Sequence, residues 1–251
     1  MINLKGKRAI VTGGSRGIGG ATSRLLAQCG ADVAVHYRSR AATADAMVAE
    51  LTALGVRSMA VAAELSDGAQ VDAAIDRVAA AWGGLDIFVG NAGIWPVEEV
   101  PVEEMDDARW LTTVRENIDG MFYSTRAALR HMGTGGRVVL VSSTAGQRGE
   151  SMHADYAASK GAMISFTKSL AVEVAWRGIT VNSVAPGWVD TEMCVEPFAD
   201  GGRERIAKGI PVGRIATPED IAAPIVVLCA AQMRHVTGEI LNVNGGSVLC
   251  G

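Results

Sequence analysis

The sequence lacks clustered cysteines, a strong charge of either sign and long apolar runs. It has 4 cysteines in 251 residues, with no CxxC or other metal-ligand spacing. We therefore expect no metal site, and reduced thiols as found in the cytoplasm. The formal net charge is −4, which gives no electrostatic reason to expect a nucleic acid or an anionic membrane as partner.

No uninterrupted apolar run reaches the roughly 18 residues of a membrane span. Residues 1–8 also lack the apolar core and cleavage site of a secretion signal. We expect a soluble, cytoplasmic protein. Hydrophobic residues make up 49% of the chain and charged residues 20%, a balance typical of a compact enzyme rather than of a disordered chain.

Short apolar runs alternate with longer segments of helical period. The strand candidates are apolar throughout, as expected where helices cover both faces of a sheet: Ala9–Thr12, Val33–His36, Ser58–Ala62, Leu85–Gly90, Arg137–Ser142, Thr180–Val184 and Ile240–Val243. The helix candidates are Ile18–Cys29, Ala42–Leu54, Ala69–Trp82, Asp106–His131, Tyr156–Trp176 and Pro218–Ala231. This order predicts a single α/β domain over residues 1–251, a three-layer doubly wound parallel sheet.

Two irregular stretches, Ile94–Asp107 and Trp188–Ile215, interrupt this alternation. Both follow the carboxyl ends of predicted strands, the edge at which open α/β sheets bind ligands. We interpret such a long irregular segment as a lid, with plain surface elaboration as the alternative.

A glycine-rich turn follows the first predicted strand. It reads Thr12-Gly13-Gly14-Ser15-Arg16-Gly17-Ile18-Gly19. In such a turn backbone N–H groups can approach a pyrophosphate, and glycine leaves no Cβ in the way. Glycine-rich turns also close ordinary strand–helix junctions, but the position at the first junction favours a dinucleotide site.

The end of the second predicted strand indicates which dinucleotide binds. An NAD site usually has an acidic residue there to bind the ribose 2′-hydroxyl, whereas this segment reads His36-Tyr37-Arg38-Ser39-Arg40. Arg38 can grip a 2′-phosphate, and Arg16 can approach it from the glycine turn. The sequence predicts NADP(H), with solvated surface arginines as the alternative reading.

Tyr156 and Lys160 lie four residues apart at the start of an Ala-rich helical segment. This spacing places both side chains on one helix face. A free tyrosine has a pKa of about 10, and a nearby ammonium group lowers it towards the range useful for proton transfer. Ser143 ends the fifth predicted strand and can orient a substrate oxygen, while Asn117 lies mid-helix, where an amide needs another reason to be present.

With these residues in place, the chain resembles the short-chain dehydrogenase/reductase family over essentially its whole length. The matching segments, in the family's order and near its spacing, are Thr12–Gly19, Asn91-Ala92-Gly93, Asn117, Ser143, Tyr156 with Lys160, and Pro186-Gly187 with Thr191.

The resemblance implies a Rossmann fold and assigns roles to the candidate catalytic residues. Tyr156 would be the general acid/base, and Lys160 would lower its pKa and bind the nicotinamide ribose. Ser143 would hold the substrate carbonyl, and Asn117 would support a water relay from Lys160 to solvent. Ser142 is not the expected serine, because the family's serine precedes the tyrosine by thirteen residues.

The resemblance also implies a set of cofactor contacts. Asn91-Ala92-Gly93 would lie against the cofactor, Pro186–Thr191 would bracket the nicotinamide, and Glu64-Leu65 would lie beside the adenine, where the family more often has Asp. The expected cofactor-binding residues are therefore Gly13, Ser15, Arg16, Gly17, Ile18, Gly19, Tyr37, Arg38, Ser39, Glu64, Leu65, Asn91, Ala92, Gly93, Tyr156, Lys160, Pro186, Gly187, Val189 and Thr191.

Within the family, the chain is most similar to 3-oxoacyl-[acyl-carrier-protein] reductases and to nearby carbonyl reductases and sugar or alcohol dehydrogenases. The first hypothesis is a 3-oxoacyl thioester reductase, and the alternative is an NADP-dependent dehydrogenase of a small alcohol, ketone or sugar. The third hypothesis is a non-catalytic NADP-binding regulator. The presence of all four candidate catalytic residues, Asn117, Ser143, Tyr156 and Lys160, argues against it. Trp95 and Trp188 are candidates for walls of the substrate pocket, with core or lid packing as an equal alternative.

Partners follow from the same resemblance. An acyl carrier protein is acidic and needs a basic docking surface. Arg177 matches one docking position, but His131–Gly136 has no Lys or Arg, so carrier docking is a weak expectation. Family members form homotetramers through the helices after the fourth and fifth strands and through the C-terminal edge, here Gly238–Gly251 with its apolar end.

Overall fold

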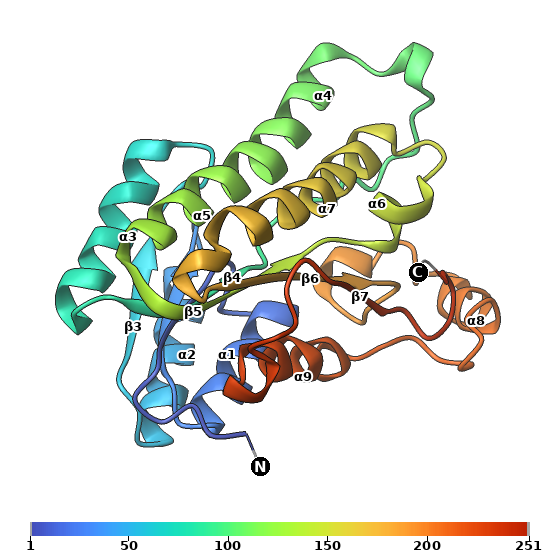
Figure 1. The fold of residues 1–251 in the computed structure, drawn as a ribbon. Coiled ribbons are helices and arrows are strands. Elements are labelled where there is room, and N and C mark those ends of the chain that lie inside the picture. The colour runs from blue at the N-terminus through green and yellow to red at the C-terminus, as the bar shows by residue number, and fades with distance from the viewer. Residues whose placement is uncertain (1, 250–251) are drawn as a thin grey trace.

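A computed structural model of the chain describes residues 2–249 and contains one seven-stranded sheet (Figure 1). The strand order is β3-β2-β1-β4-β5-β6-β7, and every neighbouring pair is parallel. The predicted doubly wound parallel sheet is therefore confirmed. The strands are β1 (Arg8–Val11), β2 (Asp32–Tyr37), β3 (Ser58–Ala62), β4 (Leu85–Gly90), β5 (Met132–Val141), β6 (Thr180–Pro186) and β7 (Ile240–Val243).

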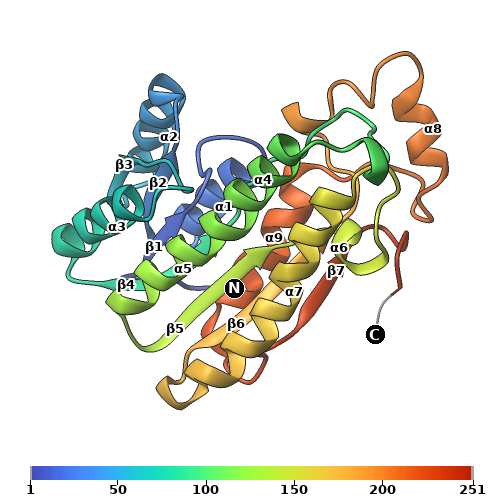
Figure 2. The same cartoon turned by 90° about the horizontal axis from the view of Figure 1, so that it is seen from above.

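Helices cover both faces of this sheet. The α-helices are α1 (Gly17–Gln28), α2 (Ala41–Ala53), α3 (Gly68–Trp82), α4 (Asp107–Val114), α5 (Gly120–His131), α6 (Thr144–Arg148), α7 (Ala154–Val174), α8 (Gly202–Lys208) and α9 (Pro218–Cys229). Figure 1 shows α3, α5 and α7 on one face and α1, α2 and α9 on the other, and Figure 2 shows α4 and α5 running beside α7. Short 3₁₀ turns occur at Val102–Glu104, Ala175–Arg177, Glu192–Cys194 and Ala231–Met233.

Alternate residues of the central strands pack into two separate apolar clusters. Phe88 and Leu140 belong to the cluster beneath α3, α5 and α7, whereas Ile87 and Val139 belong to the cluster that includes side chains of α1 and α9. All four side chains are at most 1% exposed. Burial on both faces explains why these strands are apolar throughout rather than alternating.

Two predicted elements differ from the structure. The predicted helix Asp106–His131 is interrupted by a π-helical segment, Arg115–Asp119, between α4 and α5. The predicted strand Arg137–Ser142 begins earlier, at Met132, which pairs with Leu85 before the register shifts and Arg137 pairs with Ile87. This shift allows a glycine-rich stretch to join the sheet, and such an irregularity has no sequence signal beyond the glycines themselves.

The chain reverses its direction of strand addition between β1 and β4, so their carboxyl ends border an open crevice. The glycine turn leaves β1 at this edge, and the segment 91–93 leaves β4 beside it. The irregular segment 188–215 follows β6 at the same edge and contains α8. Among the described residues, no helix is both long and apolar enough to cross a membrane.

Candidate active site

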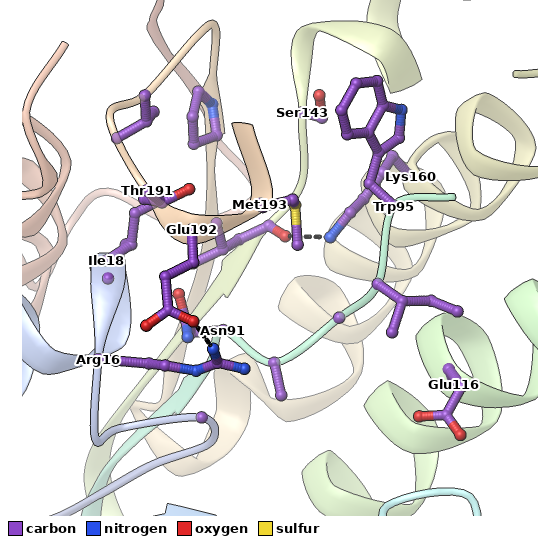
Figure 3. Close-up of a pocket in the computed structure, with 18 of the residues that line it drawn as sticks. Arg16, Ile18, Asn91, Trp95, Glu116, Ser143, Lys160, Thr191, Glu192 and Met193 are labelled. Carbon is purple, nitrogen blue, oxygen red and sulfur yellow. Dashed lines mark hydrogen bonds and ion pairs between the residues drawn. The ribbon is translucent and has the colours of Figure 1, made fainter. Parts of the chain in front are cut away.

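A cavity of about 610 Å³ opens at this edge of the sheet, within the size range of small-molecule and cofactor sites. All of the residues expected from the sequence to bind cofactor or substrate line this cavity except Gly19. Gly19 instead packs against the backbone of Gly13 within the glycine turn. Of the expected catalytic residues, Ser143, Tyr156 and Lys160 line the cavity, and Asn117 is fully buried behind its wall. Figure 3 shows Arg16, Asn91, Ser143 and Lys160 around this space.

The glycine turn has the backbone geometry that its sequence requires. Gly13 and Gly17 have φ values of +61° and +52°, a region that favours glycine. A Cβ on Gly19 would lie 2.2 Å from the Gly13 carbonyl oxygen, so this turn tolerates only a hydrogen there. Arg16 is the N-cap residue of α1, and no side chain within residues 2–249 caps this helix end. Its N–H groups are therefore free to meet an anion in the cavity.

His36, which the sequence analysis did not assign to the site, holds this turn in place. Its Nδ1 accepts a hydrogen bond from the Gly13 N–H at 3.1 Å, and its Nε2 lies 3.1 Å from the Ala63 carbonyl oxygen. This arrangement requires the neutral ring with its proton on Nε2. Burial lowers the pKa of His36, which favours that neutral form. The signal in the sequence was a lone polar residue near the end of a buried strand.

The segment after β4 is tied to the end of β1. The Thr12 hydroxyl accepts hydrogen bonds from the backbone N–H groups of Asn91 and Ala92, at 2.9 and 3.0 Å. The Asn91 amide donates in turn to the Thr12 carbonyl at 3.0 Å. These bonds fix the floor of the cavity between the glycine turn and Gly93.

Three arginines surround the end of the cavity nearest β2, and each pairs with glutamate. Arg38 lies 3.0 Å from the Glu116 carboxylate and 3.9 Å from that of Glu64. Arg16 and Arg40 both pair with Glu192, at 3.0 Å for Arg40 (Figure 3 shows the Arg16 pair). The sequence predicted the cationic character of this end. It gave no sign that residues 116 and 192 would supply the opposing charges.

Tyr156 and Ser143 meet on the other side of the cavity. Hydrogen bonding with the Ser143 hydroxyl lowers the pKa of Tyr156. The Ser143 Oγ also accepts the Ala145 N–H at 3.1 Å and so caps α6, which fixes its position. Burial raises the pKa of Tyr156, and the bond with Ser143 offsets this only in part. The phenol therefore keeps its proton at neutral pH in this structure.

Lys160 lies one turn along α7 from Tyr156, with its Nζ 5.7 Å from the tyrosine ring centroid. The ammonium group donates to the Val141 carbonyl at 2.9 Å (Figure 3). Burial lowers the pKa of Lys160 to about 8. The sequence predicted that this lysine would lower the pKa of Tyr156, but in the structure burial raises the pKa of Tyr156, because it disfavours the phenolate.

Asn117 lies in the π-helical segment, and its amide is fully used. Its Nδ2 donates to the Ile94 carbonyl at 2.9 Å and to the Ser159 hydroxyl at 3.0 Å, and its Oδ1 accepts the Ile94 N–H at 2.8 Å. A Cβ on Gly93 would lie 3.0 Å from this Oδ1 and 3.3 Å from the Lys160 Nζ. Asn117 therefore joins the helix to the chain leaving β4, directly beside the lysine. Single π turns are frequent at functional sites.

An aromatic wall borders the space beside Tyr156. The Trp95 ring lies edge-on to Tyr156 and to Trp188, with centroid distances of 6.4 and 5.8 Å. Its other neighbours include His153, stacked at 5.1 Å, and Trp188 contacts Phe198 at 5.9 Å. The two predicted wall residues thus lie together at the site, and His153 and Phe198 were missed because their segments carry no periodic pattern.

Comparisons with known proteins bear on this site. The family model described as "Enoyl-(Acyl carrier protein) reductase" matches residues 13–247. The 3-oxoacyl-[acyl-carrier-protein] reductase of Vibrio harveyi is 37% identical over 247 residues, 98% of each chain. A dehydrogenase/reductase from Sinorhizobium meliloti 1021 superposes with a TM-score of 0.91 at 38% identity, covering 98% of this chain and 97% of that one. A short-chain dehydrogenase from Burkholderia cenocepacia J2315, solved in complex with NADP, has a TM-score of 0.91 at 39% identity, covering 98% and 99%.

Proposed function

This chain belongs to the short-chain dehydrogenase/reductase family, and we propose that it uses NADP(H) to reduce the ketone of a 3-oxoacyl thioester to a secondary alcohol. The observation that carries the proposal is that Ser143, Tyr156 and Lys160 line one cavity with the glycine turn, with the Lys160 Nζ 5.7 Å from the ring centroid of Tyr156. These groups supply an acid and an oxygen-orienting hydroxyl beside a dinucleotide-sized space.

The residues at the other end of the cavity fit the cofactor. The uncapped N-terminus of α1 suits a pyrophosphate, and Gly19 keeps the turn beneath it tight. Arg16, Arg38 and Arg40 suit a 2′-phosphate, since guanidinium groups bind phosphate oxygens in pairs. When bound there, the cofactor supplies the hydride.

Tyr156 acts as the general acid in the direction of reduction. Because burial raises its pKa, the phenol carries a proton at neutral pH and can donate it from Oη to the substrate oxygen. Ser143 holds that oxygen by a hydrogen bond, and its own position is fixed by the cap of α6. We infer that Lys160, whose Nζ lies 5.7 Å from the tyrosine ring centroid, replaces this proton, with the Asn117 amide beside it.

The thioester assignment rests on similarity to the 3-oxoacyl reductases, and the structure favours a free thioester over a carrier protein. Arg177, the expected docking residue, donates its guanidinium N–H groups to the carbonyls of Leu129 (3.0 Å) and Met132. A guanidinium held by backbone carbonyls is less available to an acidic partner. A small alcohol, ketone or sugar stays the alternative substrate, and the Trp95–Trp188 wall favours an apolar one.

A substrate panel tests the proposal. NADPH consumption is followed with acetoacetyl-coenzyme A, an acetoacetyl carrier protein, ethyl acetoacetate and a ketose. We expect the highest kcat/KM for the coenzyme A ester, and no further gain from the carrier. Turnover of only the ketone or sugar would replace the thioester with the alternative substrate. Tight NADPH binding without turnover of any ketone would point to a regulator instead.

We also propose a homotetramer, as expected from the family. On α7, Val172 is 80% exposed, and Trp176, just beyond the helix, is 85% exposed. Exposed apolar side chains that lie together often mark a surface for another protein. Phe122 on α5 is a further exposed large apolar side chain, 41% exposed. The end of the tail, Cys250-Gly251, lies outside the described residues. Light scattering of the purified protein measures the assembly directly, and a monomer would contradict this assignment.

A further inference from the structure

Two arginines from different parts of the chain converge on a single carboxylate. Arg16 lies in the glycine turn after β1, and Arg40 is the N-cap residue of α2 after β2. Both guanidinium groups contact Glu192, the first residue of the 3₁₀ turn in the segment after β6. Figure 3 shows Glu192 reaching across the cavity mouth to Arg16. The Glu192 carboxylate is therefore an anion bound between two guanidinium groups, those of Arg16 and Arg40.

This place coincides with the region expected for the cofactor's 2′-phosphate. In a doubly wound sheet the adenosine ribose lies near the end of the second strand, and the phosphate that distinguishes NADP from NAD is bound there by arginine. Arg16 and Arg40 come from the two turns that border that position, and both line the cavity. Glu192 thus holds the two cations that a 2′-phosphate would use.

We propose that Glu192 is a specificity-determining residue for the cofactor: its carboxylate occupies the anion position in the cofactor-free protein, and the 2′-phosphate displaces it. The inference rests on the proposed use of NADP(H). A dinucleotide without that phosphate leaves the carboxylate on its arginines, so Glu192 competes with NADP(H) and not with NAD(H).

The charges make this exchange favourable. A phosphate monoester carries a charge of about −1.5 to −2 and three acceptor oxygens, against one negative charge and two oxygens for a carboxylate. The side chains of Arg16, Arg40 and Glu192 are 47%, 53% and 58% exposed. Ion pairs exposed to this degree are weak, so the phosphate can break them.

Arg38 is held differently, which separates its role from that of Glu192. Its partner Glu116 is only 20% exposed, and the Glu64 carboxylate lies 3.9 Å from the same guanidinium nitrogen. Glu116 itself has a raised pKa, first because of burial and then because of the nearby Glu64 charge. Both carboxylates belong to the cavity wall rather than to the segment after β6. The exchangeable carboxylate is therefore that of Glu192.

Binding of two cofactor fragments tests the proposal without turnover. Calorimetry compares adenosine 2′,5′-bisphosphate, which carries the 2′-phosphate, with adenosine 5′-diphosphate, which lacks it. For Glu192→Gln we expect the bisphosphate to bind about fivefold tighter than to the wild type, the gain expected when one weak exposed ion pair no longer competes. The diphosphate should change by less than about twofold.

Two further variants sharpen the result. Glu196→Gln removes one negative charge from the same segment. It leaves Arg16 and Arg40 in contact with Glu192. Its affinities for both fragments should equal those of the wild type. Arg40→Gln should weaken the bisphosphate and spare the diphosphate. An unchanged or weaker bisphosphate affinity in Glu192→Gln, or an equal gain for both fragments, would overturn the inference alone. A wild type that binds neither fragment would contradict the proposed cofactor as well.

Discussion

The Asn117 amide pairs with the backbone of Ile94 through two hydrogen bonds, of 2.8 Å at its oxygen and 2.9 Å at its nitrogen. The pair joins the π-helical segment to the chain that leaves β4. Ile94 directly follows Asn91-Ala92-Gly93, which is tied to Thr12. One side chain thus connects the floor of the cofactor end to the helix that packs against α7.

Replacing Asn117 by Ala should cost both stability and turnover. The backbone N–H and C=O of Ile94 would lose their partners, which lowers the free energy of unfolding by about 2 kcal/mol. We expect kcat to fall and the KM for the ketone to change little, because Asn117 lies behind the cavity wall. Asn3→Ala, at an exposed turn, is the control. A variant with wild-type kcat would show that this link is structural only.

Ser143 and Ser142 are adjacent hydroxyls with different surroundings, and comparing them isolates catalysis from stability. Ser143 lowers the pKa of Tyr156 and caps α6, whereas Ser142 donates to the Val184 carbonyl at 3.0 Å inside the sheet. Either alanine variant should lose about 1 kcal/mol of stability. Only Ser143→Ala should lose roughly 10²-fold in kcat, as for a removed donor to the reacting oxygen. Equal losses of activity would argue against the assignment of Ser143.

The buried Lys160 should make the stability of the protein depend on pH above neutrality. Its pKa is about 8 in the folded protein against 10.5 ordinarily, so between these values the unfolded chain binds more protons. The contribution of this group to the free energy of unfolding therefore rises with pH across that window. Denaturant unfolding measures the free energy of unfolding of the wild type and of Lys160→Met. The amount by which the variant exceeds the wild type should become smaller from pH 8 to pH 10. Lys168→Met, exposed on the same helix, should not. A pH-independent difference would contradict the burial of a charged lysine.

Asp155, which directly precedes Tyr156 in the chain, forms a buried ion pair with Arg109. The Arg109 Nε lies 3.2 Å from the Asp155 carboxylate, which is 0% exposed, and Thr113 donates to the same carboxylate at 2.8 Å. Arg109→Met should destabilise the protein by roughly 3 kcal/mol, because a buried charge loses its partner. The exposed pair Arg24–Glu50, with side chains 41% and 46% exposed, provides a matched control: Arg24→Met should cost less than about 1 kcal/mol. Similar losses in thermal unfolding for both variants would be inconsistent with this view.

The sequence predicted the parts of the site that depend on local pattern. The glycine turn follows from the need for positive φ at Gly13 and Gly17, and Tyr156 and Lys160 share a face because they are four residues apart on a helix. The doubly wound parallel sheet, and the sheet edge at which the cavity opens, followed from the alternation of apolar runs with helices.

The sequence did not predict contacts between segments far apart in the chain. Glu192 meets Arg16 across 176 positions, and no local pattern records such a distance. The π turn at Asn117 was also unforeseen, and the side chain in it bonds to Ile94, which lies 23 positions away in the chain. The pKa of Lys160 is lowered by burial. The spacing of apolar residues along α7 does not tell how deeply one side chain is buried.

Turnover of acetoacetyl-coenzyme A by the wild type and by Tyr156→Phe tests the central claim most directly. NADPH consumption is measured for both proteins, with NADPH affinity by fluorescence titration and Tyr123→Phe as the control. Loss of the general acid should lower kcat by roughly 10²–10⁴-fold, while NADPH affinity stays within about twofold, because the phenol donates to the substrate oxygen. Wild-type turnover in Tyr156→Phe would contradict the account.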